Sequence, residues 1–299
     1  SLEATIFSLF QIEAPPGDLP VAAVTRVHDL GVIDQEWWIR ADPVHLETAR
    51  DGLILTAGAA LDITPHEAER LVAEIMESYA ADGWRLKAPH PQRWYLKPPR
   101  APDLRTTPLS EVIGQDIRPA LPRGADGMLW HTRLNEIQIL LHTARVNEER
   151  EQLGKRPINS LWFWGGGRLP PLKSCPWAQL WSEEPVSRAL ARLAGIPARA
   201  VPAGLDEWFP QAVGGAQLVI LDQVREAVLH EDIPAWREGL ERLNRRWFAP
   251  ALAALKGGEL TTLTLYSDCG QGMQLTRRQL RRWWHRRRGL ASYGPAGSA

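Results

Sequence analysis

The segment 158–170 reads I-N-S-L-W-F-W-G-G-G-R-L-P, an apolar run followed at once by three glycines and an arginine. The apolar residues 161–164 predict a strand, and the glycines 165–167 predict a tight turn after it. Glycine lets a backbone approach an anion closely, and Arg168 adds a positive charge beside it. A simple tight turn explains the same glycines. The glycine spacing matches neither a Walker loop nor a dinucleotide-binding fingerprint.

Elsewhere, apolar runs alternate with segments of helical spacing. The runs 218–222 and 260–266 predict strands, and the segment 233–255 between them predicts a long helix. This alternation indicates an α/β fold with a mostly parallel sheet covered on both faces. Because parallel strands end at one edge of a sheet, we expect Asp222 and Asp268 to meet there. These carboxylates suit a hard metal ion. Helix capping explains the same two acids, because an acid at the end of a strand also caps the helix that follows.

Local signals predict further elements. The sequence T-P-H-E, from Thr64 to Glu67, is a capping box with proline at the first helical position, and it predicts a helix as far as about residue 81. Helical spacing predicts three more helices, over 1–10, 134–153 and 184–193. Extended patterns predict strands over 20–26, 37–40, 84–87 and 93–97. The proline-rich segment 98–108 predicts an irregular connection. Asp42 and His45 suggest turn and capping residues or, as the alternative, a proton-transfer pair.

Composition limits the classes of partner. The chain has 299 residues, 44% hydrophobic and 23% charged, which is typical of a globular protein of one or two domains. The net charge of zero provides no overall field for nucleic acid or a membrane. Cys175 and Cys269 stand far apart, which favours a reducing, cytoplasmic location. No apolar run reaches roughly 18 residues, so we expect no membrane partner. The sequence begins at Ser1 without an initiator methionine, which is typical of a trimmed chain.

The segment 279–288 combines arginines with the pair Trp283 and Trp284. Arginine interleaved with aromatic rings is typical of sites for single-stranded nucleic acid or anionic lipid. A solvated helix whose tryptophans pack on the core explains the same pattern, and the zero net charge favours that explanation. Nucleic acid is therefore not the expected partner.

The segment 147–170, which joins N-E-E-R to W-F-W-G-G-G-R-L-P, is similar to a segment of the archaeal-type, cofactor-independent phosphoglycerate mutases. The likeness extends over about 63–202, and the string Q-R-W-Y-L at 92–96 resembles a further motif with its arginine kept and its histidine absent. These mutases belong to the alkaline phosphatase superfamily. The resemblance implies a three-layer α/β sandwich built from residues 1–61 and 171–299, with a smaller α+β domain, 62–170, inserted between its halves.

The resemblance also implies a chemistry that this chain matches poorly. The family uses a serine nucleophile between two divalent ions, usually Mn²⁺ or Zn²⁺, which clamp the phosphoryl oxygens. Here Arg225 stands where the family has its first acidic ligand, and Cys269 replaces a histidine. An arginine in a site for two cations is repulsive. The surviving metal ligands that the resemblance implies are Asp222, His230 and Asp268.

Three strings, at 20–27, 39–46 and 159–170, resemble the RpfE-type bacterial regulatory proteins, a group related to these mutases. That likeness implies a catalytically degenerate protein with a regulatory or phospho-ligand-sensing role and no required cofactor. Its expected partner is a phosphorylated small molecule or a regulatory protein. Guanidinium groups pair with phosphate oxygens, and the ligand-binding residues we expect are Arg93, Asn147, Arg150, Gly165, Gly166, Gly167 and Arg168. The alternative is a metal-dependent phosphomutase or phosphatase that uses Mn²⁺ or Zn²⁺ at an altered site.

Overall fold

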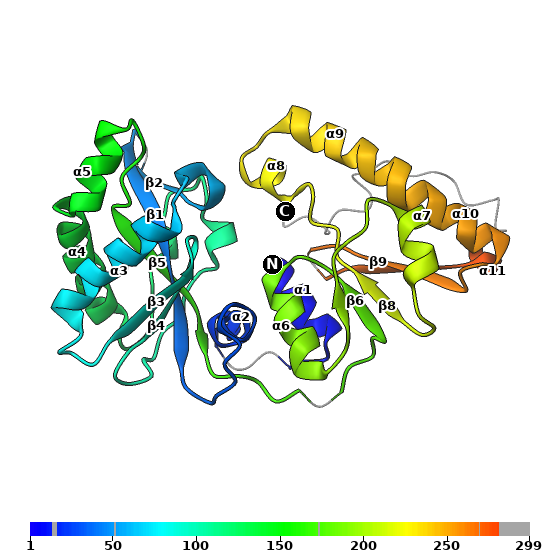
Figure 1. Cartoon of the computed structure of the whole chain (residues 1–299), viewed down its shortest axis with the longest axis horizontal. Helices are drawn as coiled ribbons and strands as arrows, with labels where there is room; N and C mark the ends of the chain where they lie inside the picture. The colour runs from blue at the N-terminus through cyan, green and yellow to red at the C-terminus, as the bar shows by residue number, and fades with distance from the viewer. Residues whose placement is uncertain (14–16, 51, 173, 269, 281–299) are drawn as a thin grey trace.

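The computed structural model describes residues 1–13, 17–50, 52–172, 174–268 and 270–280. Figure 1 shows two lobes, with helix α2 (Val21–Leu30) lying between them. One lobe contains a five-stranded sheet, and the other contains a three-stranded sheet. Helices pack against both sheets, so the predicted α/β class is confirmed. Among the described helices, none is both long enough and apolar enough to cross a membrane.

The five-stranded lobe is organised around a long central strand, β1 (Trp38–Ala49). This strand pairs with β2 (Gly52–Thr56), β4 (Arg93–Lys97) and β5 (Ser160–Gly167), and β3 (Arg85–His90) pairs with β4. Each of these pairings is antiparallel. The prediction of a mostly parallel sheet is therefore wrong for this lobe.

Three helices cover one face of this sheet: α3 (Pro65–Tyr79), α4 (Gly127–His142) and α5 (Arg145–Gln152). The predicted capping box starts α3. The Thr64 hydroxyl accepts from the Glu67 amide at 3.2 Å, and Glu67 Oε2 accepts from the Thr64 amide at 2.7 Å. The core beneath the helices contains an aromatic row in which Trp130 stacks on Trp84 and meets the edge of Phe163.

The three-stranded lobe contains the parallel pairing. Strand β6 (Gln179–Trp181) lies between β7 (Ala198–Arg199) and β8 (Gln217–Val219), and both pairings are parallel. Helices α1 (Leu2–Leu9) and α6 (Pro185–Ala194) pack beside them. The parallel sheet that the sequence predicts is thus limited, among the described residues, to three short strands.

The rest of this lobe follows β8. Two short helices, α7 (Leu205–Trp208) and α8 (Arg225–Leu229), lie before and after β8. Helix α9 (Ile233–Leu243) continues through a π-helical turn, Asn244–Phe248, into α10 (Ala249–Gly257), so the predicted long helix is confirmed. The chain then forms a hairpin from β9 (Thr262–Tyr266) and β10 (Gly272–Thr276), before α11 (Arg277–Leu280).

Two predicted elements were wrong. Residues 20–26, predicted as a strand, form helix α2, in which every residue from Val21 to Val27 is buried. In a short apolar run that is buried on all sides, the hydrophobic residues show no periodicity, so the sequence does not distinguish a strand from a helix. The predicted single helix over 134–153 is two helices, because the chain turns between His142 and Arg145.

The sheet also crosses the predicted domain boundary at residue 62. Strands β1 and β2 precede that boundary, yet β1 pairs with β4 and β5, which follow it. The resemblance implied a boundary at the start of the helix-rich segment, whereas the backbone hydrogen bonds group residues 38–56 with residues 85–167. The structure therefore assigns this stretch to the five-stranded lobe.

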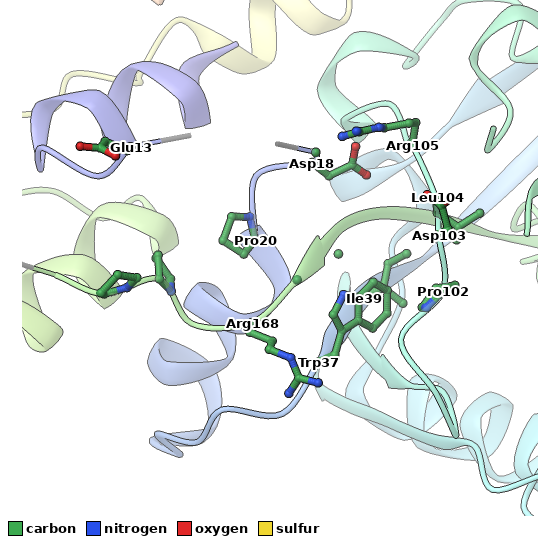
Figure 2. A pocket seen from close by; sticks show the side chains of 15 residues that line it. Glu13, Asp18, Pro20, Trp37, Ile39, Pro102, Asp103, Leu104, Arg105 and Arg168 are labelled. Carbon is green, nitrogen blue, oxygen red and sulfur yellow. The ribbon is translucent and has the colours of Figure 1, made fainter. Parts of the chain in front are cut away.

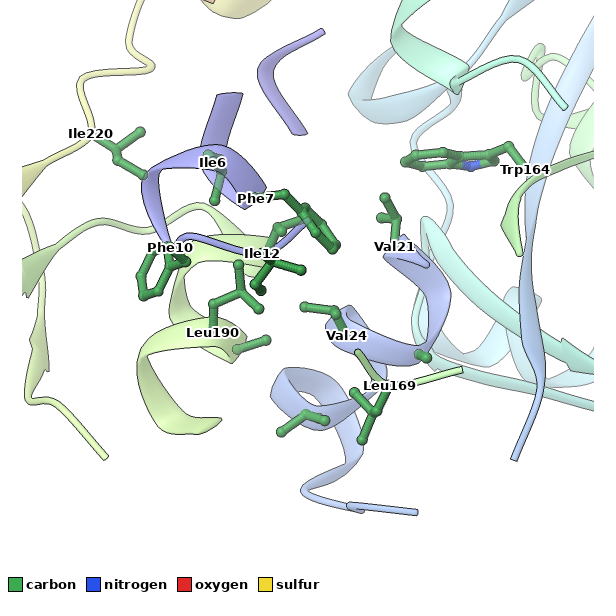
Figure 3. Close-up of a cluster of buried hydrophobic side chains, with 14 of the residues drawn as sticks. Ile6, Phe7, Phe10, Ile12, Val21, Val24, Trp164, Leu169, Leu190 and Ile220 are labelled. Carbon is green, nitrogen blue, oxygen red and sulfur yellow. The ribbon is translucent and has the colours of Figure 1, made fainter. Parts of the chain in front are cut away.

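A shared hydrophobic core joins the two lobes. Figure 3 shows Phe7 of α1 and Leu190 of α6 on one side of α2, which contributes Val24, with Trp164 of β5 on the other side. Phe10 and Val24 have no exposed surface. Because α2 packs on β1 and β5 as well as on α6, it fixes one lobe against the other. Any site lined by both lobes therefore has a defined geometry.

Candidate functional site

Two cavities in the described part of the chain enclose about 430 Å³ each. The first, which we name the glycine cavity, lies beside the end of β5, and its wall includes Gly166, Gly167, Arg168 and Arg105 (Figure 2). The second, which we name the lobe cavity, lies between the two lobes. Its walls come from α1, β1, β5, the start of α6 and the segment around α8.

The glycines do not form the predicted turn, because β5 runs through them as far as Gly167. Gly165 has φ of +64°, and the pairing of β5 with β1 shifts register beside it, between Trp38 and Arg40. A Cβ on Gly166 would lie 2.5 Å from Trp37 Cζ2, and one on Gly167 would lie 2.6 Å from Pro20 Cβ. Glycine is therefore required here for the backbone to pack against Trp37 and Pro20.

Two guanidinium groups line the glycine cavity. Figure 2 shows Arg105 beside Asp18, and Arg168 close to Trp37. Arg168 is exposed and donates to the Gln35 carbonyl. Glu13 and Asp103 also line the cavity, so its wall carries charges of both signs.

Asp18 is already hydrogen-bonded within the protein. Its carboxylate accepts from the Thr106 amide at 2.9 Å and from the Thr106 hydroxyl. Burial raises the pKa of Asp18, although these hydrogen bonds and the nearby Arg105 oppose the increase. The two arginines are the groups in this wall whose chemistry suits a bound anion.

Arg93, expected to face a phosphate, binds an internal carboxylate instead. Its Nε and Nη2 donate to Asp29 at 2.8 and 2.7 Å, and the Tyr95 hydroxyl donates to the same carboxylate at 2.5 Å. Burial acts to raise the pKa of Asp29, but the hydrogen bonds from Arg93 and Tyr95 outweigh it and lower the pKa. Arg93 is thus occupied by Asp29 and does not line the glycine cavity.

Asn147 and Arg150 also serve internal contacts. Asn147 donates to the carbonyls of Leu141 and Ile158 at 2.7 and 2.8 Å and accepts from the Ile158 amide at 2.7 Å. Arg150 is 1% exposed. Its donors reach the carbonyl of Arg156, the carbonyls of Leu61 and Asp62 and the Glu67 carboxylate. These hydrogen bonds connect α5 to the loops that precede α3 and β5. Asn147 and Arg150 therefore have a structural role.

The three expected metal ligands are not assembled into one site. Asp222 lines the lobe cavity, whereas His230 is exposed and its Nε2 lies 3.5 Å from Glu226 Oε2. Asp268 follows β9, which pairs with β10 and not with β8, so the two acids do not end neighbouring parallel strands. Among the described residues, no group of three or more His, Cys, Asp or Glu is placed to hold a metal ion. Cys269 lies outside the described residues, as does the part of the arginine-rich segment from 281 onward.

The donor set around Asp222 does not fit the family's two-ion centre either. Arg40 and Arg225 line the same cavity as Asp222. Arg225 donates to Glu3 Oε1 at 3.0 Å, so its charge sits among the acids that a cation would need. A fixed guanidinium raises the energy of a nearby divalent ion. The expectation of a metal centre at Asp222, His230 and Asp268 therefore finds no support in this geometry.

Sequence reasoning missed a buried ion pair, Arg40 with Asp42, that lines the lobe cavity. Arg40 Nε and Nη2 donate to the Asp42 carboxylate at 2.7–2.9 Å. Asp42 also accepts from Trp164 Nε1 at 2.7 Å and from the Trp94 amide at 3.0 Å. The signal was present, because two residues separated by one position on a strand share a face. His45 is not part of this pair, and its Nδ1 lies 2.9 Å from the Pro157 carbonyl.

Comparisons with known proteins find similarity to one group of enzymes over part of the chain. No protein-family model matches the chain. A 64-residue segment is 38% identical to the 2,3-bisphosphoglycerate-independent phosphoglycerate mutase of Methanosarcina mazei and covers 21% of this chain and 16% of that protein. A 159-residue segment is 25% identical to the probable enzyme of the same name from Geobacter sulfurreducens and covers 53% of this chain and 39% of the relative.

Among solved structures, the cofactor-independent phosphoglycerate mutase of Thermoplasma acidophilum aligns with a TM-score of 0.39 at 20% identity, over 81% of this chain and 70% of that one. The sequence matches to the two curated relatives span less than half of each relative's length. This chain is thus weakly similar in sequence to the 2,3-bisphosphoglycerate-independent phosphoglycerate mutases over part of its length.

Proposed function

We propose that this protein is a phosphoglycerate-mutase-like regulatory or sensing protein that binds a small phosphorylated ligand without turning it over. The observation that carries the proposal is the glycine cavity, in which Arg105 and Arg168 line one space beside the closely packed end of β5. The RpfE-like strings support the regulatory part of the proposal. The geometry around Asp222 supports the non-catalytic part, since arginines stand among the acids.

Arg105 and Arg168 provide one guanidinium group for each end of a metabolite with two anionic groups, although Glu13, Asp18 and Asp103 line the same cavity. A space of about 430 Å³ is of the size that small-molecule sites have in proteins. Guanidinium groups bind phosphate and carboxylate oxygens in a bidentate manner. Phosphoglycerate carries one phosphate and one carboxylate, and it is the substrate that the names of the similar enzymes contain. We therefore assign the phosphate to Arg168. Its exposed guanidinium donates to one backbone carbonyl, that of Gln35, and exchanges this partner for the ligand.

Replacing Arg168 with alanine is expected to weaken binding of 3-phosphoglycerate at least about tenfold, because one charge-assisted pair is lost. Isothermal titration calorimetry at low salt measures this change. Arg145→Ala, which removes an exposed arginine from α5, is the matched control and leaves the affinity unchanged. Equal affinity in Arg168→Ala and the native chain would refute the assignment of Arg168.

The alternative function is tested in the same preparation. A metal-dependent phosphomutase or phosphatase converts 3-phosphoglycerate when Mn²⁺ or Zn²⁺ is added. We expect no turnover with either ion. Turnover that disappears in Asp222→Asn would establish the enzyme and overturn the sensing role.

A further inference from the structure

We propose that the lobe cavity is a second binding site, for an organic cation with two or more ammonium groups such as a diamine or polyamine. The inference concerns a cavity separate from the glycine cavity and does not rest on the function proposed above. It stands on the charge of the cavity wall, on one buried carboxylate oxygen that lacks a donor, and on the apolar part of the wall between the charged groups.

The cavity wall is strongly acidic. Among the described residues that line it, six side chains carry a carboxylate and two carry a guanidinium group. The acids come from four parts of the chain: helix α1, strand β1, the start of helix α6, and the segment that contains α8. They are Glu3, Asp42, Glu183, Glu184, Asp222 and Glu226. The two basic residues are Arg40 and Arg225.

Several of these charges are already compensated. Asp42 is paired with Arg40 inside the protein. Glu184 caps α6, where it accepts from the amides of Val186 and Ser187 at 2.9 and 2.7 Å. Glu183 is paired with Arg188 at 3.4 Å. The acids that remain, Glu3, Glu184, Asp222 and Glu226, face Arg225 as the one further basic side chain among the described residues of the wall, so the wall has an excess of negative charge.

Glu3 supplies the independent evidence for a ligand. This side chain is 95% buried, since only 5% of its surface is exposed, and it lines the cavity. Its Oε1 accepts from Arg225, whereas its Oε2 is buried without a hydrogen-bond partner in the described part of the chain. A buried carboxylate oxygen without a donor is costly, and native proteins rarely keep one without a reason. A ligand that brings N–H donors into the cavity supplies the partner that Oε2 lacks, once the Glu3 side chain turns this atom toward the cavity.

A second carboxylate, that of Glu184, lies close enough to Glu3 for the negative charge of Glu3 to affect the pKa of Glu184. Burial raises the pKa of Glu184, the amide hydrogen bonds oppose this, and the negative charge of Glu3 adds to the increase. Two buried carboxylates that repel each other are stabilised by a cation between or beside them. Arg225 supplies one positive charge beside Glu3, so a second cation is needed to balance both carboxylates.

The arrangement favours an extended organic cation over a metal ion. The acids are spread around a space of about 430 Å³, and no three of the described ligand-type residues converge on one point. Leu109, Ile113 and Trp164 form apolar parts of the same wall. Methylene groups pack on such a surface, and the indole ring favours an ammonium group over its face. A diamine therefore matches both the separated charges and the apolar wall.

Calorimetric titration of the full chain with putrescine and with spermidine tests the site. We expect saturable binding that weakens with salt, with spermidine tighter than putrescine. Glu3→Gln and Asp222→Asn are each expected to weaken binding about tenfold, since each removes one charge-assisted partner. Arg225→Gln is expected to strengthen it, because this change frees Glu3 Oε1 and removes a competing cation.

Glu77→Gln is the matched control, because it removes an exposed carboxylate from α3 in the other lobe and leaves the affinity unchanged. Asp222 is half-buried and its substitution is isosteric, so Asp222→Asn keeps the test valid if Glu3→Gln folds poorly. Equal affinity in native, Asp222→Asn and Arg225→Gln chains would overturn the site. Saturation by Mg²⁺ that displaces the amine would also overturn it, because the preferred cation is then a metal. Arg168→Ala leaves amine binding intact, which separates this test from that of the phosphorylated ligand.

Discussion

Replacing Asp42 with alanine is expected to lower the free energy of unfolding by about 3–5 kcal/mol, because it leaves the Arg40 guanidinium buried without a counter-ion. Arg40 is 5% exposed and Asp42 is fully buried. The same change removes the acceptor of Trp164 Nε1 and of the Trp94 amide. Urea denaturation followed by tryptophan fluorescence measures the loss.

Two controls define the cause. Glu149→Ala breaks the exposed pair with Arg70 and is expected to cost less than about 1 kcal/mol. The double variant Arg40→Met with Asp42→Leu removes both charges, and we expect it to recover much of the lost stability, since apolar replacements of a buried pair are often tolerated. A loss below about 1 kcal/mol in Asp42→Ala would show that the pair is not a structural centre.

Replacing Arg150 with methionine is expected to lower the free energy of unfolding by about 3 kcal/mol, because three backbone carbonyls and the Glu67 carboxylate then lose a buried donor. Methionine keeps much of the side-chain volume, so the loss reports on the hydrogen bonds more than on packing. Thermal and urea denaturation of the two chains measure the difference.

This substitution also separates a structural role from a binding role. Arg150 does not line the glycine cavity, so the folded variant is expected to bind 3-phosphoglycerate as the native chain does. Arg145→Met, on the exposed face of the same helix, is expected to change stability by less than about 0.5 kcal/mol. A stable Arg150→Met chain that has lost 3-phosphoglycerate binding would restore Arg150 as a ligand-binding residue.

The sequence determined the elements whose signals are local. The capping box from Thr64 to Glu67 starts α3 where predicted, and the helix predicted over 184–193 is α6, which ends at Gly195 in the left-handed conformation. The long helical pattern over 233–255 appears as α9 continued into α10. Such signals are readable because each residue interacts with partners three or four positions away.

The candidate site was predictable only in part. The segment that contains Gly166, Gly167 and Arg168 lines a cavity. The anion-binding role that glycines beside a cation suggested stays a prediction. Arg105, in the irregular connection, was not singled out, because a lone arginine among prolines carries no periodic signal. The acidic lobe cavity was not predicted either, since its acids are distributed over four distant parts of the chain.

What only the tertiary structure decided is the pairing of groups that lie far apart in the chain. Arg93 binds Asp29 across 64 positions, and Arg150 reaches the Leu61 carbonyl across 89. An arginine that binds a phosphate and one that binds a buried carboxylate look identical in sequence, because both need only a guanidinium group. The choice between them depends on which partner the fold brings within hydrogen-bond distance. The structure of a short apolar segment such as α2 also depends on its tertiary contacts. Burial on every side removes the hydrophobic periodicity that would distinguish a helix from a strand.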